Sequence, residues 1–141
     1  MKTTTLLAKP GLLTKLEGAI ATMAFFVGGV LVIWLSYIHF HLWQDGYRHI
    51  PTIGPLFLVQ SVAGLLIGLL VIAVRRVWTA IVGVGFALAT MAGFLISVEH
   101  GLFGFTDSWA APFAGLAFTV EIATAAALVV AAVLCLTAAT A

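Results

Sequence analysis

The chain has 141 residues, of which 63% are hydrophobic and only 8% are charged, whereas about 25% of residues are charged in soluble domains. Together with a mean hydropathy of +1.22, this composition excludes an ordinary water-soluble domain. The net charge is +1 and no lysine-rich stripe occurs, so the chain has no positive field that would attract nucleic acid, and nucleic-acid binding is excluded as well.

Four segments are apolar and long enough to cross a bilayer, whose hydrocarbon core takes roughly 20 helical residues. Lipid offers the backbone no hydrogen-bond partner and four strands cannot close a barrel, so these segments must be helices. The first is too long for the apolar region of a signal peptide, and we expect it to be retained. The sequence therefore predicts an all-α, four-helix transmembrane bundle in a single domain, 1–141, with helices at about 18–42, 55–74, 77–98 and 110–136.

The positive charges predict the orientation of the bundle. Five of the six cations precede the first helix or lie between the second and third, namely Lys2, Lys9, Lys15, Arg75 and Arg76. Only Arg48 lies on the opposite side. The positive-inside rule then places both termini in the cytoplasm and the longer loops, about 43–54 and 99–111, on the outer face of the cell membrane.

Small residues recur every four positions in three of the predicted helices. The second carries Gly64 and Gly68, the third Gly85, Ala89 and Gly93, and the fourth Ala123, Ala127 and Ala131. Small side chains at this spacing let helices approach closely in lipid. These stripes predict helix contacts within the bundle, with a second copy, or with other membrane subunits.

All four histidines fall on the predicted outer side: His39, His41, His49 and His100. Imidazoles together with carboxylates are ligands for zinc or copper, and pairs of imidazoles hold haem iron. Positions two apart on a helix point about 200° apart, so one metal could use both His39 and His41 only if the helix unwinds there. His39 and His100 end two different helices at similar depth and are the candidate ligands of a haem b. Alternatively, the histidines cap helices and contact lipid headgroups.

Glu121 is the most unusual residue of the apolar segments. It is predicted about ten residues into the fourth helix, which is about 15 Å below the surface at about 1.5 Å per residue. A carboxylate at that depth costs several kcal/mol unless it is protonated or paired, so a functional role is expected. It could relay protons, bind a cation or hydrogen-bond a neighbouring helix, and Gln60 and Tyr37 are the predicted partners by depth.

Few other features point to chemistry. Arg48 and Glu99 are predicted to form an exposed ion pair between the outer loops, of little energetic weight. The sequence contains no nucleophile–base constellation, phosphate-binding loop or HExxH motif. We therefore assign no catalytic residue.

The segment "GYRHIPTIGPLFLVQSVAG" at 46–64 resembles a recurring stretch in small actinobacterial membrane proteins with four spans. These proteins carry a histidine- and tryptophan-rich end to the first helix, here "HFHLW" at 39–43, and a "GLFGF" after the third, here at 101–105. The resemblance covers residues 20–130, approximately. It implies an integral membrane protein of the cell envelope and transfers no activity.

Three functions remain open from the sequence. The first is a non-catalytic accessory subunit of a larger membrane complex, of respiratory or oxidase type, which the small size and the small-residue stripes favour. The second is a redox or metal-binding protein that uses the outer histidines with haem b, copper or zinc. The third is a small proton-coupled transporter that uses Glu121.

Overall fold

The computed structural model describes residues 10–140, and side chains within 14–139. Its elements are α1 (Pro10–Gln44), the short 3-10 helix η1 (Tyr47–His49), α2 (Ile53–Ala73), α3 (Val77–His100) and α4 (Ala114–Thr140). All four α-helices are long and apolar enough to cross a membrane. The predicted four-helix bundle is confirmed, and the protein is of the integral membrane type.

Two helix starts differ from the predicted ones by four residues or more, and α4 also ends four residues later, at Thr140. Helix α1 extends back to Pro10, a residue that suits a first helical turn because its missing N–H would have no partner there. Helix α4 begins at Ala114 rather than at residue 110. The backbone of Phe113 has a φ of 62°, which an α-helix cannot contain. Hydropathy marks apolar segments, but these local backbone constraints decide where a helix starts.

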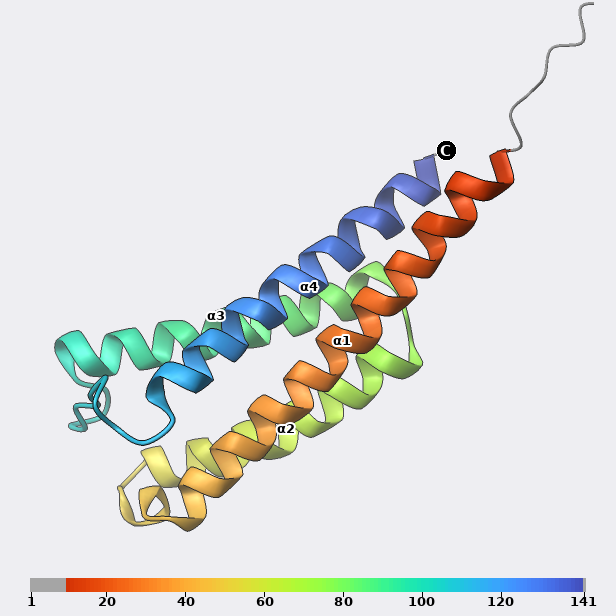
Figure 1. Cartoon of the computed structure of the whole chain (residues 1–141). Coiled ribbons are helices and arrows are strands. Elements are labelled where there is room, and N and C mark those ends of the chain that lie inside the picture. The colour runs from red at the N-terminus through yellow and green to blue at the C-terminus, as the bar shows by residue number, and fades with distance from the viewer. Residues whose placement is uncertain (1–9, 141) are drawn as a thin grey trace, which may run out of the picture.

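The helices are not evenly spaced. Helix α1 packs along α2 and α4, and α3 packs along α4, whereas α2 and α3 make few contacts with each other. Figure 1 shows α2 and α3 diverging from the short connection between them, at residues 74–76. We call the end of the bundle with this connection the turn end. The other end, which carries segments 45–52 and 101–113, is the loop end.

Glycines bring the helices close together toward the turn end. A Cβ built on Gly68 would lie 2.8 Å from the carbonyl oxygen of Gly29, and a Cβ on Gly29 would lie 2.9 Å from that of Gly68. A Cβ on Gly28 or on Gly83 would collide with the side chain of Leu128. Helices α1 and α2 therefore touch through their backbones, and Leu128 fills a hole between two glycines of α1 and α3.

The predicted small-residue stripes of α2 and α3 differ in whether they contact another helix. Gly64 and Gly68 are buried inside the bundle, so the prediction that a stripe forms a close helix contact is confirmed for α2. On α3, by contrast, no atom of the described structure other than the adjoining residues and backbone of α3 itself lies within 4 Å of a Cβ built on Gly85 or Gly93. The buried glycine of that helix is Gly83, because the rotation of α3 about its axis turns the predicted stripe away from α4.

Candidate binding site

The segment after α3 is folded tightly enough to fix a carboxylate. Leu102 and Phe105 exchange two backbone hydrogen bonds, of 2.7 and 2.9 Å, across Phe103 and Gly104, which both have positive φ. Positive φ at both central residues is what a type I′ turn requires. The Ser97 hydroxyl then donates to the Phe105 carbonyl at 3.2 Å and accepts the Asp107 N–H at 3.0 Å. Asp107 is thereby held against the end of α3.

Tyr47 connects the two loop segments. Its hydroxyl donates to the Asp107 carboxylate, with oxygen–oxygen distances of 3.2 and 3.4 Å. Its ring stacks on Phe57 at 4.6 Å and meets the edge of Phe105 at 5.7 Å between centroids. Burial, reinforced by the negative charge of Asp107, raises the pKa of Tyr47 to about 12. The phenol is therefore a hydrogen-bond donor across the physiological pH range.

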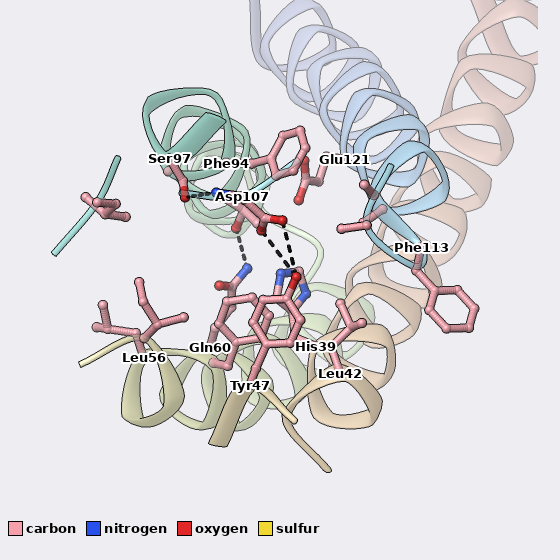
Figure 2. A pocket seen from close by; sticks show the side chains of 18 of the residues that line it. His39, Leu42, Tyr47, Leu56, Gln60, Phe94, Ser97, Asp107, Phe113 and Glu121 are labelled. Atoms are coloured by element: carbon pink, nitrogen blue, oxygen red, sulfur yellow. Dashed lines mark hydrogen bonds between the residues drawn. The ribbon is translucent and has the colours of Figure 1, made fainter. Parts of the chain in front are cut away.

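A cavity of about 360 Å³ lies between the helices at the loop end, with Tyr47 and Asp107 in its wall. This volume falls within the roughly 300–1,000 Å³ typical of small-molecule sites. Helices α1, α2, α3 and α4 and both loop segments contribute to the lining. Figure 2 shows His39, Gln60, Tyr47, Asp107 and Glu121 gathered around the same space, whereas the ring of Phe113 turns away from it.

His39 is buried in the wall of this cavity. Its Nδ1 lies 2.9 Å from the carbonyl oxygen of Leu35. A carbonyl can only accept, so Nδ1 carries the hydrogen, and in the neutral ring Nε2 is left as an acceptor. The ring also contacts Phe57 at a centroid distance of 5.1 Å, so its orientation is set by two neighbours.

Glu121 also lies in the cavity wall, and its residue is only 2% exposed. Its Oε2 is the one buried side-chain oxygen or nitrogen in the described part of the chain that has no hydrogen-bond partner. An unpartnered buried acceptor costs about 1–3 kcal/mol, more if it is charged. Such a group in a cavity wall is placed to contact something that enters the cavity.

The predicted surroundings of Glu121 need correction. Glu121 lies seven residues after Ala114, which corresponds to about 10 Å along the helix rather than 15 Å, because α4 starts later than predicted. Tyr37 is 64% exposed and stacks on His41, so it is not the partner. Gln60 does share the cavity, but its Nε2 donates to Thr90 Oγ1 at 2.7 Å.

The other histidines lie in separate surroundings. His41 Nε2 is 3.1 Å from the Asp45 carboxylate, one helical turn further along the chain. His49 accepts from Arg48 Nε at 3.1 Å, and the exposed His100 lies 3.9 Å from Glu99. The predicted ion pair between Arg48 and Glu99 is not formed, because each side chain turns to its own sequence neighbour.

These placements bear on the predicted metal and haem ligands. Of the four histidines, only His39 lines the cavity. No group of three or more His, Cys, Asp or Glu side chains that could hold a metal ion occurs in the described region. The predicted shared histidine site therefore gains no support from this structure.

Sequence analysis singled out Glu121, Gln60 and His39 but missed the roles of Tyr47 and Asp107. Their contact joins residues 60 positions apart in the chain. The "GLFGF" turn is a local signal that a fixed loop follows α3, yet nothing in the sequence indicates that this loop meets Tyr47. The sequence places the Asp107 carboxylate on the outer side with the histidines but does not indicate its partner.

Comparison with known proteins adds no relative. No family model matches the chain, and no significant match was found among curated proteins or among solved structures. The resemblance to small actinobacterial four-span proteins therefore stays a prediction, and the site has to be interpreted from its own geometry.

Proposed function

We propose that this integral membrane protein binds a small amphiphilic molecule in the loop-end cavity, with Glu121 contacting its polar headgroup. The observation that carries the proposal is the buried Glu121 Oε2, which lies in the wall of a ligand-sized cavity without a hydrogen-bond partner. A bound polar group would satisfy this atom and offset the free energy lost by burying it.

The residues that line the cavity favour an amphiphilic ligand over a purely polar one. Leu56 and Val59 on α2 and Ala89 on α3 line the cavity, yet their side chains are exposed on the bundle surface, Val59 by 63%. These residues mark an opening between the two helices that make few contacts. Because this opening is apolar and within the spanning segments, an apolar chain or ring dissolved in the bilayer would fit there.

The proposal also includes the orientation of the bundle and its location in the cell membrane, both inferred from the distribution of positive charges. With both termini in the cytoplasm, as the positive-inside rule predicts, the cavity lies in the outer half of the cell membrane. The resemblance to small actinobacterial proteins of the cell envelope supports this location.

The three functions predicted from the sequence relate differently to this proposal. A proton-coupled transporter that uses Glu121 would need such a binding step, so the two are compatible. An accessory subunit is supported by the outward-facing Gly85, where the surface of α3 is open to another helix. A redox or metal centre has the least support, because only His39 of the four histidines lines the cavity and the described residues form no group of three metal-ligating side chains.

Photolabelling in proteoliposomes tests the proposal. The probe is a neutral single-chain alcohol with a photoreactive diazirine in its chain, and labelled peptides are quantified by mass spectrometry. We expect peptides from 56–63 and 86–97 to be labelled well above the lipid-facing peptide 129–136, whose exposed side chains provide the reference. Equal labelling of all three regions would contradict a binding site.

Matched glycine variants separate the cavity from the lipid surface. Gly93 lines the cavity and has free space around it, so Gly93→Leu should fill the opening without a clash and lower cavity labelling to the reference level. Gly85→Leu is the control, because Gly85 has equal space on α3 but lies outside the lining. Labelling that persists in Gly93→Leu would argue against this cavity.

A further inference from the structure

The cavity is acidic. Asp107 and Glu121 belong to its lining, and none of the described lining residues is Lys or Arg. Asp107 accepts hydrogen bonds from the Tyr47 hydroxyl and the Ser108 N–H, whereas Glu121 Oε2 accepts none. A carboxylate within a membrane-spanning segment is stabilised by an opposite charge, and the cavity wall supplies no such charge.

Most of the hydrogen-bonding capacity left in the cavity is that of an acceptor; the exception is Gln60, whose amide keeps one N–H after donating to Thr90 Oγ1. The hydroxyls of Tyr47, Thr90 and Ser97 all donate within the protein, and the Nδ1–H of His39 donates to Leu35. His39 Nε2 and, in the ionised carboxylate, Glu121 Oε2 remain as acceptors. A headgroup that donates hydrogen bonds or carries positive charge therefore fits, and an anionic headgroup does not.

Aromatic rings from several elements surround the same space. The lining contains Tyr47, Phe57, Phe86, Phe94, Phe105 and Phe118. Aromatic faces attract organic cations, and the attraction is larger where water is excluded. Rings and carboxylates together form a favourable environment for an alkylammonium group. A bare metal ion fits less well, because the described residues bring no three metal-ligating side chains together.

We infer that the headgroup bound in this cavity is that of a lipophilic organic cation, an amine or quaternary ammonium with an apolar chain or ring. The cationic group would lie between Glu121 and the aromatic rings, and the apolar part would extend through the opening beside Val59. The inference rests on the proposed binding function and adds the charge of the ligand.

Two probes that share one photoreactive chain test this inference in proteoliposomes. One carries a trimethylammonium head and the other a hydroxyl. We expect the ammonium probe to label the cavity peptides, 56–63 and 86–97, about tenfold more strongly than the alcohol, since the Coulomb attraction between a cation and a partly desolvated carboxylate contributes at least that factor. Labelling of each probe is normalised to the reference peptide 129–136.

Variants of two glutamates then show which carboxylate causes the preference for the ammonium probe. Glu121→Gln keeps the shape of the side chain and should abolish the preference for the ammonium probe while the alcohol still labels the cavity. Glu99→Gln is the control, because Glu99 is an exposed carboxylate outside the lining, and should keep the full preference. A preference that survives in Glu121→Gln overturns the inference.

The unmodified protein provides a second measurement that requires no variant to fold. Decyltrimethylammonium should compete with the ammonium probe for the cavity peptides, and decyl sulfate should not. Equal competition by both, or equal labelling by the ammonium and alcohol probes, overturns the cationic ligand but leaves the binding site standing. Failure of both probes to label the cavity above the reference overturns the binding site itself.

Discussion

Toward the turn end, Gly29 and Gly68 bring the backbones of α1 and α2 into contact, whereas at the loop end α2 and α3 stand apart around a cavity of about 360 Å³. One buried polar group in each half illustrates a second difference. The buried Thr79 hydroxyl near the turn lies 2.6 and 2.8 Å from the carbonyls of Val74 and Arg76. Glu121 in the loop half has an oxygen without any partner.

This contrast indicates a division of roles within one small bundle. Close backbone contacts in the turn half hold the helices together through dispersion, the main attraction between helices in lipid. The loop half then tolerates an open space and an unsatisfied carboxylate. Local structure of marginal stability is typical of binding regions, and the following substitutions test whether the two halves differ in this way.

Gly68→Leu should have the largest effect. Its Cβ would lie 2.8 Å from the Gly29 carbonyl oxygen and would also collide with Ile33, so α1 and α2 must separate. We expect a loss of about 3 kcal/mol or failure to fold, measured by thermal unfolding in detergent with circular dichroism. Gly85→Leu should leave the midpoint unchanged, and a Gly68→Leu protein as stable as this control would refute the tight contact.

Glu121→Leu should act in the opposite direction. Replacing an unpartnered buried acceptor by an apolar side chain of similar size removes the cost of burying it. We expect the protein without ligand to gain about 1–2 kcal/mol in stability, measured in the same unfolding experiment, while cavity labelling by the ammonium probe is lost. A lower midpoint would mean that Glu121 has a stabilising partner.

Tyr47→Phe tests the connection across the loop end. The substitution removes the hydroxyl that donates to Asp107 but keeps the ring that stacks on Phe57. We expect a loss of about 1 kcal/mol, with a coupling to Asp107→Asn in a double-mutant cycle. Additive effects of the two substitutions would show that the hydrogen bond contributes nothing.

The last prediction concerns alkaline pH and leaves stability near neutral pH unchanged. The chain has two tyrosines, so Tyr37→Phe leaves Tyr47 as the only phenol, and its ultraviolet titration should have a midpoint near the pKa of about 12 rather than at 10.0. The unfolded state then loses this proton first, so the contribution of Tyr47 to stability is constant below pH 10.0 and falls as the pH rises toward 12. A titration midpoint near 10.0 would mean that the Tyr47 phenol is exposed to water.

Much of the site was indicated by single residues of the sequence. Glu121 stands out because a carboxylate in an apolar segment is expensive. His39 stands out as a predicted metal or haem ligand, and Gln60 as a predicted partner of Glu121 at similar depth. All three line one cavity. The expected contact of Tyr37 with Glu121 and the ion pair of Arg48 with Glu99 failed, since depth along a helix says nothing about the direction in which a side chain points.

The sequence by itself determined a membrane bundle of four helices, because segment length and hydropathy are local properties and lipid permits few other structures. It also predicted that a small-residue stripe would form a close helix contact, without indicating with which helix. Only the tertiary structure decided that Gly83 rather than Gly85 faces Leu128, and that Tyr47 meets Asp107. The first contact depends on how α3 is rotated about its axis, and the second on where the loop segments lie. Rotation and loop position are both set by packing against residues that are distant in the chain.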